Sequence, residues 1–236
     1  MAVQYSIGID VGGTNLKIAI IDARLRIVKK RILNTCAYRK KIELIAVIEE
    51  SINAIIKDSG LKRSLISGVG IGLPGPVDAG KGLVHFLPNI PGWKKVALRA
   101  ILRKKIRLPV YIDNDVKLMG LAEYHLGAAR GSRCAVCLTL GTGVGGAIVI
   151  EGRIFRGASN VTGEIGHLPI NEEGPHCNCG GRGCLEAYIG NNRIIEQAKK
   201  VFRRAISLEE LSALAKKGDR RAFAIWLAVG RHLGMA

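Results

Sequence analysis

The sequence has few aromatic residues and few acidic ones. Phe, Trp and Tyr make up 5% of its 236 residues, so the scattered basic residues are not interleaved with aromatic side chains. Lys and Arg number 36 against 19 Asp and Glu, a net charge of +17, but charge alone identifies no nucleic-acid-binding fold. We therefore interpret the charge as a solvated basic surface and expect no nucleic acid as partner.

Signals for a membrane span or for secretion are also missing. Residues 42–56, IELIAVIEESINAII, carry charges among their apolar residues, whereas a span needs about 20 consecutive, mostly apolar residues. The start, MAVQYSIGID, has no basic segment followed by an apolar one and a cleavage site. We expect a cytoplasmic protein with no membrane partner, in which the six cysteines stay reduced and favour metal or structural roles over disulfides.

Apolar strands and amphipathic helices alternate along the chain. A strand, a glycine-rich turn and a second strand occupy residues 5–22, and the same pattern returns at residues 134–155. Between and after them the periodicity predicts strands at 26–33, 66–78 and 109–116 and helices at 41–60, 96–106 and 116–130. The repetition predicts an α/β fold, with an N-terminal domain at 1–115 and a C-terminal domain at 116–236 facing a shared cleft.

Two further helices are expected near the end of the chain. Ser207 and Glu210 have the spacing of a capping box, and Gly218 stops the helix that follows. Asp219 then caps a last helix. We expect one apolar stripe on it, made of Phe223, Trp226, Leu227 and Leu233.

The first glycine-rich turn lies in the segment DVGGTNLK. Glycines let backbone N–H groups approach phosphate oxygens, a hydroxyl can donate as well, and a carboxylate at a strand end can hold hydrated Mg²⁺. An ordinary hairpin turn is the alternative for two glycines alone, but the full combination is more specific. The candidate phosphate and magnesium residues are Asp10, Gly12, Gly13, Thr14 and Lys17.

The second glycine-rich turn, GTGVGG at residues 141–146, has the spacing of a dinucleotide-binding fingerprint. That fingerprint requires a helix after the glycines, whereas AIVIEGRIF reads as a strand. We therefore reject a dinucleotide-binding fold and predict a second phosphate-binding hairpin, with Gly141, Thr142 and Gly143 as its residues.

Acidic and amide side chains follow several predicted strands. Asp113, Asn114 and Asp115 end a buried strand, where a carboxylate can take the proton of a substrate hydroxyl, although Asp-Asn-Asp is also a good turn or helix cap. Glu164, His167 and Glu186 add groups that commonly bind hydroxyl-rich ligands.

Three cysteines lie within eight positions of the segment HCNCGGRGCLEAY. With His167 they give the spacing H-x9-C-x-C-x4-C, which suits tetrahedral zinc in a closed structural site better than a disulfide. Zinc would fix the loop that carries Glu186 and would take no part in chemistry; reduced free thiols are the alternative. The candidate ligands are His167, Cys177, Cys179 and Cys184.

These motifs occur in the order in which they stand in a known family. DVGGTNLK, GIGLPGPVDAGKGLVHFLPNIPGW, IDNDVK, LGTGVGGA, GEIGH and CNCGGRGCLEAY together resemble the ROK family of bacterial sugar kinases and repressors over essentially the whole chain. The resemblance implies the actin-like ATPase (ribonuclease H-like) fold, with sugar and ATP meeting between two α/β domains.

The resemblance also implies roles for individual residues. Asp115 matches the catalytic base, and the two glycine-rich turns match the sites for ATP phosphates and magnesium. The cysteine motif matches a structural zinc site, similar to the glucokinase and N-acetylmannosamine kinase branches. The matching sugar contacts are Asn89, Asn114, Asp115, Glu164, His167 and Glu186, with Gly75 nearby.

The expected function is ATP-dependent phosphorylation of a hexose, glucose first, by a homodimer or homotetramer. N-acetylmannosamine or another hexose is the alternative substrate. Two departures from the family are expected: an N-terminal DNA-binding module and the C-terminal nucleotide-binding segment are both expected to be missing. A non-catalytic sugar-binding fragment is therefore the rival hypothesis, and a basic zinc module for nucleic acid is a third, which leaves most motifs unexplained.

Overall fold

The computed structural model describes residues 4–13, 15–34, 40–87 and 92–236. Two of the predicted site residues, Thr14 and Asn89, lie outside these ranges. The chain divides into two compact units, each described by itself below: unit 1 contains residues 1–119 and 158–160, and unit 2 contains residues 120–157 and 161–236. The predicted boundary after residue 115 stays a prediction.

Unit 1 is built on a five-stranded sheet with the order β3-β2-β1-β4-β7. Strands β1, β2 and β3 pair antiparallel, whereas β4 pairs parallel with both β1 and β7. A two-stranded ribbon, β5 and β6, follows β4 in the chain. The bounds are β1 Tyr5–Val11, β2 Asn15–Asp22, β3 Ile27–Asn34, β4 Ile66–Leu73, β5 Val77–Asp78, β6 Leu83–Val84 and β7 Val110–Asn114.

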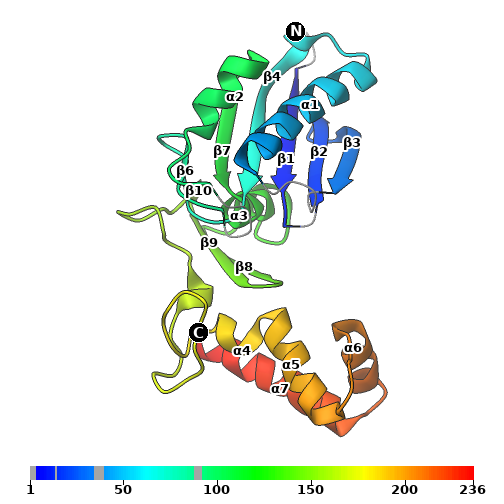
Figure 1. Ribbon diagram of the computed structural model, residues 1–236, viewed down its shortest axis with the longest axis vertical. Coiled ribbons are helices and arrows are strands. Elements are labelled where there is room, and N and C mark those ends of the chain that lie inside the picture. The colour runs from blue at the N-terminus through cyan, green and yellow to red at the C-terminus, as the bar shows by residue number, and fades with distance from the viewer. Residues whose placement is uncertain (1–3, 14, 35–39, 88–91) are drawn as a thin grey trace. The chain divides into compact units, whose positions relative to one another are not determined.

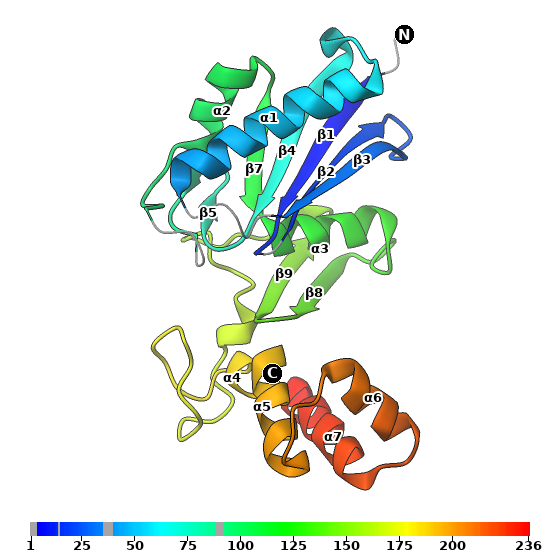
Figure 2. The same cartoon turned by 45° about the vertical axis from the view of Figure 1, so that its right-hand side comes forward.

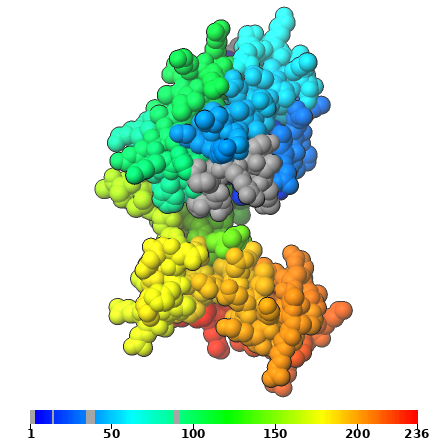
Figure 3. All heavy atoms as spheres, in the orientation of Figure 1, coloured from blue at the N-terminus to red at the C-terminus, as the bar shows by residue number. Residues whose placement is uncertain are grey.

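Helices α1 (Lys41–Ser59) and α2 (Leu98–Ile106) pack against the sheet of unit 1. Both lie on the same face of the sheet, with α1 crossing the central strands (Figures 1 and 2), and they hide that face in the space-filling view (Figure 3). A short 3-10 helix, η1 (Arg63–Leu65), leads into β4. Residues at helical spacing on α1, among them Leu44, Ile48 and Ile52, are completely buried, as the sequence periodicity predicted.

The first strand–turn–strand prediction is confirmed in β1 and β2. The register aligns Asp10 with Lys17, and alternate residues of β2, such as Leu16, Ile18 and Ile20, are buried. The predicted stop of α1 is also confirmed, because Gly60 adopts the left-handed conformation at φ 70° and donates its N–H to the Lys57 carbonyl.

Unit 2 contains a three-stranded antiparallel sheet with the order β10-β9-β8. Helix α3 (Asp115–Leu126) starts in unit 1 and ends in unit 2. Its Gly120 permits close packing on this sheet: a Cβ there would lie 2.7 Å from the Cβ of Ala147. The strand bounds are β8 Cys134–Leu140, β9 Val144–Ile150 and β10 Arg153–Ile154. A strand therefore follows GTG, which confirms that the fingerprint is not dinucleotide-binding.

Helices make up the rest of unit 2. They are η2 (Ile165–His167), α4 (Glu186–Ile189), α5 (Asn191–Phe202), α6 (Leu208–Lys216) and α7 (Arg220–Met235). Helix α7 contacts α4, α5 and α6, and Figure 1 shows α4 and α5 running beside it. Among the described residues, no helix is both long and apolar enough to cross a membrane.

The capping box predicted before α6 is present. The Ser207 hydroxyl accepts the Glu210 N–H at 3.1 Å, and the Glu210 carboxylate in turn accepts a hydrogen bond from the Ser207 backbone. The same carboxylate also binds Arg204 at 2.5 Å.

The buried face of α7 differs from the predicted apolar stripe. Phe223 is 59% exposed and Leu227 44% exposed, whereas Ala222 and Ile225 are buried. Trp226 and Leu233 do pack against buried clusters, as expected. The buried face is the one that meets the other helices: Ala222 and Ile225 belong to a hydrophobic cluster with residues of α5 and α6.

Candidate functional site

The first glycine-rich turn joins β1 to β2 in unit 1. The Gly12 N–H donates to the Asn15 carbonyl at 2.9 Å, and a Cβ on Gly12 would lie 3.0 Å from that oxygen. Asp10 and Lys17 face each other across the hairpin, with Nζ 3.2 Å from Oδ2 and both side chains about half exposed. Gly13 is exposed at the tip. The turn thus presents a half-exposed carboxylate and a half-exposed ammonium side by side, next to the exposed Gly13.

Asn114 and Asp115 form a hydrogen-bonded junction where β7 ends and α3 begins. Asn114 Nδ2 donates to the Gly75 carbonyl at 3.2 Å and to Asp115 Oδ1 at 3.1 Å. The Val116 N–H donates to the same Oδ1 at 2.9 Å, and Asn114 Oδ1 accepts the Lys117 N–H at 3.1 Å. Two donors on one oxygen fix the plane of the Asp115 carboxylate. The structure therefore brings three predicted residues together: Gly75, Asn114 and Asp115.

The second glycine-rich turn joins β8 to β9 in unit 2 and is held by α4. Glu186 Oε2 accepts the Val144 N–H at 2.9 Å, and a Cβ on Gly143 would lie only 2.4 Å from that oxygen. The Asn191 N–H donates to the Gly141 carbonyl at 2.9 Å. Glycine at 143 thus makes room for the Glu186 carboxylate. Sequence reasoning missed this contact, because Glu186 and Val144 are 42 positions apart and no local pattern relates them.

A cavity of about 250 Å³ lies beside this turn. Thr142 from the turn, Glu186 from α4 and the start of α5 line it together. The remaining polar lining comes from Asn178, Asn192, Arg193 and Glu196. The cavity connects the predicted phosphate-binding turn with the cysteine loop and two helices within one unit.

The segment GEIGH packs directly on β9. A Cβ on Gly166 would lie 1.9 Å from the Val144 carbonyl oxygen, and one on Gly163 would lie 2.7 Å from the Gly146 carbonyl oxygen. Glycines therefore allow the two backbones to approach. Glu164, next to Gly163, is exposed. The glycines of this motif have a packing role that their sequence pattern did not reveal.

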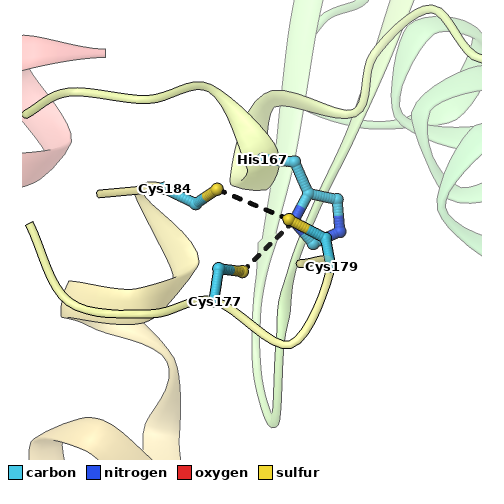
Figure 4. A group of neighbouring side chains, drawn as sticks. All are labelled: His167, Cys177, Cys179 and Cys184. Atoms are coloured by element: carbon cyan, nitrogen blue, oxygen red, sulfur yellow. Dashed lines mark hydrogen bonds between the residues drawn. The ribbon is translucent and has the colours of Figure 1, made fainter. Parts of the chain in front are cut away.

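Four side chains of unit 2 form a compact cluster: His167, Cys177, Cys179 and Cys184. One ligand atom from each lies within 4.8 Å of all the others, an arrangement that could hold a metal ion. Figure 4 shows the three sulfurs and one imidazole edge converging. His167 Nδ1 lies 3.7 Å from Cys177 Sγ, and Cys179 Sγ lies 3.6 Å from Cys184 Sγ.

These distances suit a tetrahedral ion. Bonds of about 2.3 Å to sulfur and about 2.0 Å to nitrogen place neighbouring ligand atoms roughly 3.5–3.8 Å apart. A disulfide would need sulfurs at about 2.05 Å, and the three thiols are free. All four predicted ligands are brought together, so the donor set fits zinc.

The cluster creates unequal thiols. A backbone hydrogen bond at Gly181, with contacts to the Cys177 and Cys184 thiols, lowers the pKa of the exposed Cys179. Burial, followed by the neighbouring thiols, raises the pKa of Cys184 to about 12. A metal-binding thiol must lose its proton, so a metal ion bound here would release protons, and acid would weaken its binding.

The loop around the cluster is organised by short backbone bonds. The Cys177 N–H donates to the Gly181 carbonyl at 2.9 Å, and the Gly180 N–H donates to the Cys177 carbonyl at 3.0 Å. Gly180 has φ 93°, a conformation that glycine adopts without strain. The chain can therefore reverse between Cys177 and Cys184.

Comparison with known proteins places these features in a family context. The chain is 36% identical over 233 residues to a glucokinase of Thermotoga maritima, with 93% of this chain and 72% of that protein covered. It is 31% identical over 242 residues to a xylose repressor of Caldicellulosiruptor bescii, with 97% of this chain and 60% of that protein covered. The chain is thus shorter than both relatives.

A solved structure agrees with the sequence comparison. The crystal structure of a ROK family glucokinase from Streptomyces griseus, in complex with glucose and AMPPNP, matches with a TM-score of 0.80 at 28% identity, covering 98% of this chain and 77% of that one. The mixed α/β chain has the actin-like ATPase fold of such kinases. The ROK family matches residues 6–236. The chain belongs to the ROK family.

Proposed function

We propose that this chain phosphorylates a hydroxyl group of a hexose with ATP as the phosphoryl donor, in the cytoplasm. The observation that carries the proposal is the Asn114–Asp115 junction, where two donors fix one carboxylate oxygen at the start of α3. The glycine-rich turns and the similarity to a glucokinase support the same reaction.

In the proposed reaction, the hexose oxygen forms a bond to the γ-phosphorus of ATP. The bond from that phosphorus to the β–γ bridging oxygen breaks, and ADP leaves. Asp115 accepts the proton of the attacking hydroxyl. Such transfer depends chiefly on positioning and electrostatics, which a carboxylate of fixed plane provides.

The two glycine-rich turns would bind the phosphates. Backbone N–H groups of the first turn and of Gly141–Gly143 would donate to phosphate oxygens. The Asp10 carboxylate, exposed at its strand end, fits Mg²⁺, which supplies charge neutralisation when bound. Lys17 is placed to compensate negative charge beside it.

We propose zinc as the ion of the His167 cluster, with a structural role. The donor set of one imidazole and three thiols and the spacing of the ligand atoms support it. Zinc would hold the loop that leads to Glu186. His167, Glu164 and Glu186 remain candidate sugar contacts, together with Gly75, Asn89 and Asn114.

Glucose is the first substrate to test, because the glucokinase of Thermotoga maritima is similar over most of this chain. N-acetylmannosamine and other hexoses differ from glucose by a single hydroxyl or acetyl group and belong in the same assay. Assembly as a homodimer or homotetramer is part of the proposal.

A second candidate function is sugar binding without phosphorylation. The similarity to a xylose repressor favours it. In that case hexoses or xylose would raise the melting temperature of the chain, and no ADP would form with any sugar.

The test is a coupled ADP-release assay on the 236-residue chain with glucose, N-acetylmannosamine, mannose and xylose, with and without Mg²⁺. Asp115→Asn is expected to lower kcat roughly 10²- to 10⁴-fold with sugar affinity retained, because a general base is lost. Asp58→Asn is the matched control, since Asp58 is a half-exposed partner of Arg31 on the surface. Full turnover in Asp115→Asn would remove Asp115 from the role of base.

A further inference from the structure

Lys117 is an exceptional lysine because only 3% of it is exposed. It lies in the first turn of α3, two residues after Asp115. Burying an amino group costs free energy because the group loses its hydration. This cost is offset where acceptor groups of the protein replace the water. The proposed mechanism gives Lys117 no role, although it is the buried lysine nearest in sequence to the proposed base.

One acceptor for Lys117 is the main chain of a distant segment. Its Nζ donates to the Asn160 carbonyl at 2.5 Å. Residues 158–160 belong to unit 1, whereas the residues on either side of them, 120–157 and 161–236, belong to unit 2. Residues 158–160, called the strap below, therefore belong to the same unit as Asp115, and the bond from Lys117 contacts this segment.

Two of the three strap residues lie at the surface, and the third has an uncommon backbone conformation. Ala158 and Ser159 are exposed, and Asn160 adopts a left-handed backbone conformation at φ 63°, which is uncommon for residues other than glycine. Glu164, a candidate sugar contact, follows Asn160 by four positions. A restraint on the Asn160 carbonyl thus limits where the chain that leads to Glu164 can start.

The opposite end of Lys117 is fixed as well. Its backbone N–H donates to Asn114 Oδ1 at 3.1 Å, and Asn114 Nδ2 donates to Asp115 Oδ1 at 3.1 Å. Lys117 is therefore connected through its backbone to the carboxylate of the proposed base and through its side chain to the strap. A single residue links both.

We infer that Lys117 is a positioning residue of the hexose site, which holds the strap 158–160 beside the turn that presents Asp115. The inference rests on the proposed function. It assigns Lys117 no contact with phosphate and no proton transfer; its effect is on the affinity for the hexose, through the segment that it restrains.

The test compares Lys117→Met, which keeps the length of the side chain without a donor, with Lys117→Arg, which keeps a donor. In Lys117→Met we expect the KM for the hexose to rise roughly 10- to 100-fold, the scale of losing a hydrogen bond to a charged group. The KM for ATP is expected to stay within about twofold, and kcat to fall less than the hexose KM rises. Lys117→Arg should restore most of the hexose affinity.

Hydrogen exchange of residues 157–163, measured without sugar, gives a second readout that does not depend on turnover. Exchange in this segment should become faster in Lys117→Met and not in Lys105→Met, a control whose lysine binds Glu49 at 2.6 Å on the surface of α2. All assays run well below the lowest melting temperature of the variants, so that loss of folded protein does not mimic loss of affinity.

An unchanged hexose KM in Lys117→Met would overturn the inference, as would an equal rise in the KM values for hexose and ATP. Absence of hexose-dependent ADP release and of hexose binding in the unaltered chain would overturn the proposed function instead. The exchange comparison would still decide whether Lys117 restrains the strap.

Discussion

The two units of this chain are stabilised in different ways. Unit 1 has one continuous hydrophobic cluster that extends from β1 through α1, β4 and α2 to β7. Unit 2 has three smaller clusters, and one of them consists of Cys177, Cys184 and Ala187. A large core stabilises a sheet by itself, whereas small cores generally require additional cross-links such as metal ions. The His167 cluster is positioned to be that cross-link.

The chain carries a reporter for each unit. Its two tryptophans are Trp93, 4% exposed within the core of unit 1, and Trp226, which packs against the α5–α7 cluster of unit 2. Replacing either one by Phe leaves a single tryptophan, and excitation selective for tryptophan then follows the unfolding of one unit at a time. The predictions below use this pair of variants as backgrounds.

The largest effect is expected from Cys179→Ser. The variant should lose its equivalent of zinc, and the unfolding of unit 2 should shift to lower urea concentration while that of unit 1 does not. A metal present at a thousand times its Kd stabilises the folded state by about 4 kcal/mol. Metal analysis and Trp226 fluorescence measure the two changes.

Cys134→Ser is the matched control for this variant, because Cys134 is an exposed thiol of β8 in the same unit, outside the cluster. Retention of one zinc per chain by Cys179→Ser, or an equal shift in the Trp93 signal, would contradict the prediction that the metal stabilises unit 2 selectively.

A smaller effect is expected when two buried leucines, one in each unit, are replaced by alanine and the losses in free energy of unfolding are compared. Leu44 of α1 and Leu211 of α6 are both completely buried, and Leu→Ala in a core costs about 2–5 kcal/mol. We expect Leu44→Ala in the upper half of that range, because the large cluster around it cannot collapse into the cavity, and Leu211→Ala in the lower half. Urea unfolding followed at Trp93 and Trp226 measures both; equal values would remove the contrast between the cores.

The smallest effect is expected on how the stability of each unit depends on pH, through one carboxylate in each unit. A side-chain hydrogen bond from Arg221 lowers the pKa of Asp219, the cap of α7, to about 2. A backbone hydrogen bond from Arg26, followed by one from its side chain, lowers the pKa of Asp22 in unit 1. Because both folded-state pKa values lie below the unfolded ones, each group stabilises its unit above about pH 4 and loses that contribution as the pH falls towards 2.

Asp219→Asn should therefore flatten the acid dependence of the Trp226 transition, and Asp22→Asn that of the Trp93 transition. Asparagine keeps a side-chain oxygen that can accept the backbone hydrogen bonds, whereas the titration and the ion pairs with Arg221 and Arg26 are lost. Thermal unfolding between pH 6 and pH 2.5 (approximate limits of the titration window) measures the slopes. If either substitution changed the pH dependence of the other unit's transition, the assignment of each carboxylate to the stability of its own unit would be wrong.

Unit 1 was largely predictable from the sequence. The alternation of β2 and the helical spacing of α1 give the buried faces that the structure has, and Gly60 ends α1 as predicted. These signals are local, since one face of each element must be apolar whatever packs against it. The His167 cluster was predictable for a related reason, because the ligand spacing of a closed metal site lies within 18 consecutive positions, 167–184.

Other features were not predictable, because they depend on residues that are far apart. The stripe on α7 was misplaced because the buried face of that helix contains Ala222 and Ile225, which pack against neighbouring helices. Glu186 was expected to bind sugar, yet its Oε2 also accepts the Val144 N–H. No local period predicts such partners.

The sequence by itself therefore determined the alternation of strands and helices, the two glycine-rich turns and the set of candidate metal-binding side chains. Each of these follows from the order of residues over a few positions, through backbone periodicity, glycine geometry or ligand spacing. Tertiary structure alone decided the close approach of GEIGH to β9, the support of the second turn by Glu186 and the bond from buried Lys117 to Asn160. Those contacts form because folding desolvates groups that must then find partners wherever the packed backbone offers them.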